Sequence, residues 1–81
     1  MEVTLEQMLE QAVATHRGGD LTEAERVYRR ILDSHPFHPD ANHNLGVLAL
    51  SVNRIAEGLP FLKLALEAKP SVEQFWISYI A

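Results

Sequence analysis

The chain has 81 residues, of which 47% are hydrophobic and none is cysteine, and its net charge is −4. The hydrophobic content and the length favour one small folded domain. The lack of cysteine excludes a disulfide framework and a thiolate metal site. The acidic balance argues against nucleic acid as a partner, because non-specific binding requires a basic face. No apolar run approaches the roughly 18 residues of a membrane span, and the acidic start lacks the layout of a signal peptide, so we expect a soluble, cytoplasmic protein with no membrane partner.

A first helix is predicted between Thr4 and the glycine pair Gly18–Gly19. Thr4 followed by Gln7 has the spacing of a capping box, in which two side chains satisfy free amides at a helix start. Glycine readily adopts the left-handed conformation that ends a helix. The apolar face at helical spacing comprises Leu5, Met8, Leu9, Ala12 and Val13.

A second helix is predicted from Asp20 through Leu32, with Asp20 as its cap three residues before Glu23. Alanine, valine, tyrosine and isoleucine recur along one side of this segment, which is typical of a core-facing helix. The opposite side is charged, and we expect a solvated face of paired residues there: Arg26, Arg29 and Arg30 with Glu23 and Glu25.

Two further helices are predicted over about 39–52 and 55–69, separated by a turn at 53–54. Pro36 ends the preceding helix and Pro39 suits the first turn of the next. Pro60 lies inside the later helix, where it removes one amide, so we expect a local bend but no break. The expected core stripes are Leu45, Gly46, Ala49 and Leu50 on one helix, and Leu59, Phe61, Leu62, Ala65 and Leu66 on the other.

A fifth helix is predicted to open with a capping box of Ser71 and Gln74. It is almost entirely apolar, and the sequence stops at Ala81 before another helix could cover it. We therefore expect either a fragment of a longer array or a unit that pairs with another chain. The expected self-association surface comprises Phe75, Trp76, Tyr79 and Ile80.

The sequence repeats with a period of 34 residues, since Pro36 and Pro70 are 70 − 36 = 34 apart. Displacement by that period also aligns several small and apolar residues, as a packing repeat requires. The aligned pairs are Ala12 with Gly46, Val13 with Val47, Ala24 with Gly58, Tyr28 with Leu62, and Leu32 with Leu66.

This pattern resembles the tetratricopeptide repeat (TPR), a helix–turn–helix unit of 34 residues. Leu45-Gly46, the small Ala24 and Gly58, the aromatic Tyr28 and the two prolines stand at that family's signature positions, and Trp76 stands where a third repeat carries tryptophan. The resemblance implies an all-α fold of antiparallel helix–turn–helix repeats stacked as a short right-handed solenoid. Repeat 1 would cover about 5–38, repeat 2 about 39–72, and a partial third repeat 73–81.

The resemblance also implies a concave binding face lined by the first helix of each repeat. Its expected partner-binding residues are Leu9, Glu10, Val13, His16, Arg17, His43, Asn44, Val47, Leu50, Ser51, Ile77 and Ser78. Glu6, Asp40 and Gln74 hold further positions of the same face. Asn44 is the most informative of these, because an amide donates and accepts and can therefore pair with an extended peptide backbone.

No catalytic or cofactor-binding motif is present: there is no glycine-rich phosphate loop and no nucleophile motif. Three histidines, His35, His38 and His43, surround Asp40 and could in principle ligate a metal. That segment crosses two prolines and a helix start, so we expect turn and surface histidines without a metal.

We therefore expect a protein–protein interaction scaffold that is not an enzyme and has no cofactor, binding a protein or peptide through its concave face. The chain is also similar to tetratricopeptide segments at the front of bacterial proteins with glycosyltransferase or sulfotransferase domains. The alternatives are thus a docking or assembly segment of such a transferase, and a homodimer formed through the apolar fifth helix.

Overall fold

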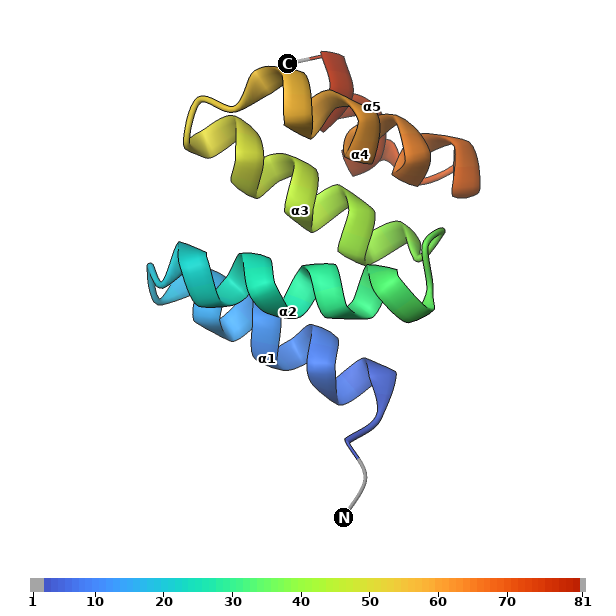
Figure 1. Ribbon diagram of the computed structural model, residues 1–81. Coiled ribbons are helices and arrows are strands. Elements are labelled where there is room, and N and C mark those ends of the chain that lie inside the picture. Colours follow the sequence, from blue (N-terminus) through green and yellow to red (C-terminus); the bar gives the residue numbers. More distant parts are fainter. Residues whose placement is uncertain (1–2, 81) are drawn as a thin grey trace.

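The computed structural model describes residues 3–80, which form five helices and no strand (Figure 1). Consecutive helices run in roughly opposite directions, and each packs against the next. The all-α class is thereby confirmed. The helices are α1 (Leu5–Arg17), α2 (Leu21–Ser34), α3 (Pro39–Ser51), α4 (Ile55–Ala68) and α5 (Glu73–Ile80).

The helix bounds share the period of the sequence. α1, α3 and α5 begin at Leu5, Pro39 and Glu73, with 39 − 5 = 34 and 73 − 39 = 34. α2 and α4 begin at Leu21 and Ile55, with 55 − 21 = 34. α1 and α3 have 13 residues each, and α2 and α4 have 14 each, so the α1–α2 and α3–α4 hairpins match in length.

The predicted caps of the first hairpin are confirmed. Thr4 N–H donates to Gln7 Oε1 at 2.9 Å and Gln7 N–H donates to Thr4 Oγ1 at 3.1 Å, which completes the capping box of α1. Asp20 Oδ1 accepts from Glu23 N–H at 3.2 Å at the start of α2. Between the helices, Gly19 has φ = 91°, a conformation that favours glycine.

The second hairpin begins with a cap that the sequence did not suggest. His38 Nδ1 accepts from Ala41 N–H at 3.1 Å, and Pro39 follows as the first residue of α3. The turn between α3 and α4 contains Asn53 with φ = 63°, which asparagine tolerates better than most residues. α4 continues through Pro60, so the expected absence of a break is confirmed.

The start of α5 differs from the prediction. The helix begins at Glu73, two residues after Ser71, so Ser71 is not its cap. Gln74 instead directs its Nε2 toward Ser78 Oγ, one turn further along α5, at 3.4 Å. The chain reaches α5 through a turn in which Val72 N–H donates to Lys69 O and Phe75 N–H donates to Val72 O.

The core lies where the helices meet, in two clusters. The larger cluster joins α1, α2 and α3, and the smaller one joins α4 to α5 through Ala65, Leu66 and Phe75. Leu59 is 40% exposed and Leu50 is half-buried, so neither belongs to the fully buried core that the stripes suggested. The larger cluster comprises Ala12, Ala24, Val27, Tyr28, Ile31, Ala41, Leu45 and Leu48.

Candidate binding surface

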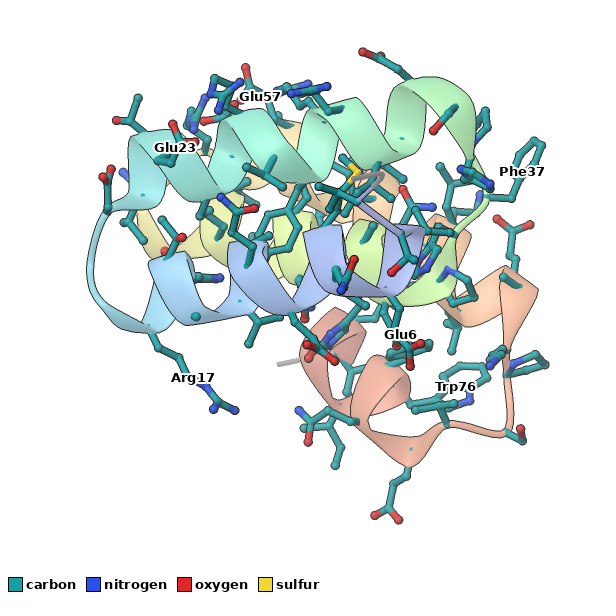
Figure 2. The ribbon with its side chains drawn as sticks, turned by 90° about the horizontal axis from the view of Figure 1, so that it is seen from below. Glu6, Arg17, Glu23, Phe37, Glu57 and Trp76 are labelled. Atoms are coloured by element: carbon teal, nitrogen blue, oxygen red, sulfur yellow. The ribbon has the colours of Figure 1, made fainter. Side chains whose placement is uncertain are left out.

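The odd-numbered helices share one side of the molecule. α3 contacts both α1 and α5, while α2 and α4 lie on the other side (Figures 1 and 2). Figure 2 shows Glu6 and Arg17 of α1 pointing away from α2, whereas Glu23 of α2 and Glu57 of α4 lie at the opposite side. The side formed by α1, α3 and α5 carries the predicted partner-binding residues and is called the odd-helix face below.

The centre of the odd-helix face is a polar contact between α3 and α5. His43 Nε2 lies 2.7 Å from Ser78 Oγ, and His43 Nδ1 lies 3.3 Å from Asn44 Oδ1. The imidazole also stacks on the Phe75 ring at 4.7 Å and 30°. The Ser78 hydroxyl can donate to Nε2 or accept from it, so the direction of each hydrogen bond depends on the tautomer of His43.

This contact brings three predicted binding residues together, and it changes the role expected of one of them. Asn44 Oδ1 is engaged by His43, so the amide cannot offer both its groups freely. Its Nδ2 makes no hydrogen bond within residues 3–80 and is the donor that remains for a ligand. The hydrogen bond between His43 and Ser78 holds α5 against α3.

On α1, the predicted residues divide into inward-facing and exposed ones. His16 Nδ1 lies 3.2 Å from the Tyr28 hydroxyl, with the two rings edge to face at 6.0 Å, so His16 faces α2 and not a ligand. Leu9 packs on the core and Val13 is half-buried, whereas Glu10 and Arg17 are exposed.

Burial raises the pKa of the Tyr28 phenol to about 12.

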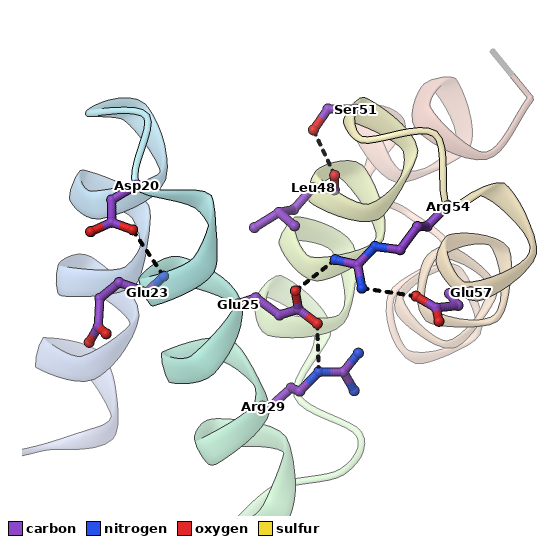
Figure 3. Close-up of polar contacts among 8 residues, drawn as sticks. All are labelled: Asp20, Glu23, Glu25, Arg29, Leu48, Ser51, Arg54 and Glu57. Carbon is purple, nitrogen blue, oxygen red and sulfur yellow. Dashed lines mark hydrogen bonds and ion pairs between the residues drawn. The ribbon is translucent and has the colours of Figure 1, made fainter.

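On α3, Val47 and Leu50 are half-buried and Ser51 is exposed. The Ser51 hydroxyl donates to Leu48 O of its own helix at 2.6 Å (Figure 3), so its hydrogen is already used. Val47 occupies the position equivalent to Val13 of α1, since 47 − 13 = 34. Two half-buried valines thus occupy equivalent positions of α1 and α3.

The expected self-association surface on α5 is only partly exposed. Phe75 is a correction: it is 4% exposed and belongs to the core between α4 and α5. Trp76, Tyr79 and Ile80 are 46%, 37% and 75% exposed, and the indole N–H of Trp76 donates to Pro70 O at 2.6 Å. Ile77, predicted for the binding face, is 44% exposed.

An apolar groove of about 430 Å³ lies between the end of α3, the start of α4 and the end of α5. Sequence reasoning missed the contribution of α4, because it assigned the whole apolar stripe of that helix to the core. Helical spacing gave no signal for this difference, because Ile55 and Leu59 fall on the same side of α4 as Leu62 and Leu66. The groove is lined by Leu50, Ile55, Leu59, Ser78, Tyr79 and Ile80.

A charged network lies on the opposite side and links the two hairpins (Figure 3). Glu25 of α2 accepts from Arg54 at 2.7 Å and from Arg29 at 2.9 Å, and Arg54 reaches Glu57 at 3.2 Å. The Arg54 and Arg29 hydrogen bonds hold the pKa of the Glu25 carboxyl below its usual value. Together with the Glu23–Arg26 pair, these contacts confirm the expected solvated face and the pairing of Arg26 and Arg29, whereas Arg30 forms no ion pair within residues 3–80.

The histidines lie in separate environments. His35 contacts Ser34, His38 caps α3, and His43 contacts Ser78. Within residues 3–80, no three side chains of metal-binding type lie close enough together to hold an ion. None of the five described helices has the length and apolar character needed to cross a membrane.

Comparison with known proteins adds no family to this geometry: no family model, curated protein or solved structure matches the chain.

Proposed function

We propose that this chain is a non-catalytic scaffold for protein interactions that binds an extended peptide or a protein segment along its odd-helix face. In this proposal the hairpins are two tetratricopeptide-like repeats, followed by the first helix of a third, in a short right-handed solenoid. The observation that carries it is the recurrence of helix bounds every 34 residues, which places α1, α3 and α5 on one side. Stacked helical repeats create extended concave surfaces of this kind.

The side chains on that face support a ligand of mixed character. Val13 and Val47 provide apolar contact, and Asn44 Nδ2 provides a donor for a peptide carbonyl. The exposed charges are mostly acidic, with Glu6, Glu10 and Asp40 outnumbering Arg17. An extended peptide that carries apolar and basic residues therefore complements this surface better than an acidic one.

A random 12-residue peptide library displayed on phage tests the proposal. The most enriched peptide is synthesised and titrated into isotopically labelled chain, and amide chemical shifts are recorded. We expect shifts confined to α1, α3 and α5, and an enrichment of lysine and arginine in the selected peptides. Binding should weaken at least about tenfold in Val47→Glu, because a buried carboxylate without a partner is costly.

Two variants provide the matched comparison. Asn44→Ala removes the free amide donor and should weaken the same peptide by several-fold, whereas Arg30→Ala, on the opposite side, should leave its affinity unchanged. Shifts that map to α2 and α4, or equal binding by all three variants, would reject the odd-helix face as the site. Repeating the titration with added salt separates the two contributions to affinity, because salt weakens the charge–charge attraction and leaves the apolar contact in place.

A further inference from the structure

The strongest unexplained surface is the apolar groove together with two neighbours on α5, Trp76 and Ile77. This combined surface is called the apolar end below. Helical spacing places Trp76 one turn before Ile80 on the same side of α5. Six of its large apolar side chains are substantially exposed: Ile55 by 52%, Leu59 by 40%, Trp76 by 46%, Ile77 by 44%, Tyr79 by 37% and Ile80 by 75%.

We propose that the apolar end is a homodimer interface, covered by the apolar end of a second copy of this chain related by a two-fold axis. α5 of each copy then packs against α5 of the other, and Tyr79 and Ile80 enter the partner's apolar groove. Among residues 3–80, α5 contacts only α3 and α4, so its outer side has no neighbour among these residues. The groove volume of about 430 Å³ accepts more than one apolar side chain.

The exposed area is sufficient for a stable dimer. At about 200 Å² for a large apolar side chain, six side chains that are about half exposed present roughly 600 Å². Two copies would then bury roughly 1,200 Å², which exceeds the approximately 1,000 Å² expected of a specific interface. The apolar end includes Trp76 and Tyr79, and tryptophan and tyrosine are typical of residues that dominate binding energy.

Charge permits a second copy at the apolar end in a two-fold arrangement. The chain has 11 acidic and seven basic residues, so most pairings of two copies bring like charges together. The apolar groove has no ionisable side chain except the Tyr79 phenol, and the only charged residue of α5 is Glu73 in its first turn. The apolar end can therefore meet its own copy with the glutamates at the rim, where water screens them.

The opposite end of the molecule explains why the assembly closes as a dimer. A hollow of about 140 Å³ between α1 and α2 is lined by Val3, Met8, Gln11, Val27 and the two arginines Arg26 and Arg30. Head-to-tail stacking would press these arginines against the uncharged apolar end, which supplies no carboxylate inside the contact. A two-fold contact buries the same uncharged surface from both sides and leaves the arginines in water.

The test is the molar mass of the full chain, measured by light scattering and sedimentation equilibrium over a wide concentration range. We expect the mass to rise from 9.1 kDa to a plateau at twice that value. Ile80→Glu and Ile55→Glu should each raise the dimer dissociation constant at least about tenfold. Both side chains are exposed, so far-ultraviolet circular dichroism should show unchanged helix content.

Phe37→Glu is the matched control, because Phe37 is 72% exposed but lies in the α2–α3 loop, away from the apolar end (Figure 2). This variant should dimerise as the unmodified chain does. A monomer at every concentration, or a mass that grows beyond two copies, would overturn the proposal. The proposal would also be overturned if Ile80→Glu dissociated the dimer and Ile55→Glu did not, because α4 would then lie outside the interface.

Leu50, Ile77 and Ser78 belong both to the predicted partner-binding residues and to the apolar end, so variants outside this overlap separate dimerisation from peptide binding. Val47→Glu, on the odd-helix face, should leave the dimer mass unchanged, and Ile55→Glu should leave peptide affinity unchanged. If the chain is monomeric and an apolar helical peptide shifts the amides of α5 and the start of α4, the groove has another occupant and the proposed dimer is wrong.

Discussion

The two hairpins have the same helix lengths and the same period, yet they are filled in different ways. At three equivalent positions the α1–α2 hairpin has Ala12, Ala24 and Tyr28, and the α3–α4 hairpin has Gly46, Gly58 and Leu62. All six residues are buried. The first hairpin thus combines small methyl groups with a large aromatic ring, while the second combines bare glycines with a smaller aliphatic side chain.

The glycines of the second hairpin are required by a close helix contact. A Cβ atom at Gly46 would lie 2.6 Å from Leu62 Cδ2, and one at Gly58 would lie 2.9 Å from Gly46 O. In the first hairpin the equivalent positions accept methyl groups, and the Tyr28 hydroxyl reaches His16 on the facing helix. The comparison shows that one backbone unit tolerates different cores, provided that the side chains at facing positions change together.

The largest expected effect is the removal of the central side chain from each hairpin. Tyr28→Ala should destabilise the chain by about 3–5 kcal/mol and Leu62→Ala by about 2–5 kcal/mol, because both side chains are fully buried. Losses of this size are comparable with the whole stability of a small domain. Urea denaturation followed by circular dichroism measures both. A loss below about 1 kcal/mol at either position would contradict the packing described for that hairpin.

The next effect tests the close contact with coupled substitutions. Gly46→Ala should cost about 1–3 kcal/mol, because the new methyl group meets the Leu62 side chain. In the Leu62→Ala background the Leu62 contact is gone and only the Gly58 carbonyl oxygen, 3.1 Å from the same Cβ position, remains. The cost of Gly46→Ala should therefore fall by about 1–2 kcal/mol. Gly58→Ala is the control: it meets the Gly46 carbonyl oxygen, and Leu62→Ala should not relieve it. Additive losses for Gly46→Ala and Leu62→Ala would show that the two positions are not in contact.

Much of this fold could be predicted because its signals are local or periodic. The Thr4–Gln7 capping box, the Asp20 cap and the interruptions at glycine and proline set the first helices within a residue or two. The 34-residue offset anticipated that Gly46 and Gly58 would both be buried as small residues. Repeats make such positions visible, since a site required in one unit recurs in the next.

The candidate site was less predictable, because its contacts join residues far apart in sequence. Nothing local indicates that His43 meets Ser78, 35 residues away, or that Arg54 meets Glu25. The resemblance marked positions on a face, but it could not show that His16 turns toward Tyr28. It also could not show that Phe75 is buried while Leu59 remains exposed, because both carry the same apolar signal.

A smaller effect exploits the phenol that only the first hairpin contains. The pKa of Tyr28 is raised from 10.0 to about 12, so the folded state favours the neutral phenol. The buried neutral phenol stabilises the fold fully below pH 10.0. This stabilisation is lost as the pH rises toward 12, because the Tyr28 phenol ionises at a lower pH in the unfolded chain than in the folded one. Tyr28→Phe should cost about 1 kcal/mol at neutral pH through the lost hydrogen bond, and it should flatten the alkaline decline. Tyr79→Phe, at an exposed tyrosine, should retain that decline.

The smallest expected effect concerns the charged link between the hairpins. Glu25→Gln removes the negative charge that Arg29 and Arg54 share and one of the two acceptor oxygens, and these partly exposed pairs contribute no more than about 1 kcal/mol. The pKa of Glu25 is lowered from 4.5 in the folded state, so its stabilisation is present above that pH and is lost as the pH falls through the lower folded value. The difference between the original chain and Glu25→Gln in urea midpoint should therefore shrink on acidification and in high salt.

Glu67→Gln is the control for that measurement, because Glu67 is exposed on α4 and forms no ion pair within residues 3–80. The urea midpoint of Glu67→Gln should differ little from that of the original chain at neutral and at acid pH. A pH-independent loss in Glu25→Gln would mean that the side chain stabilises the hairpin junction by packing and not by charge. The junction would then resemble the hairpin interiors, where shape decides stability, and the two hairpins would be joined by the same kind of contact that fills each of them.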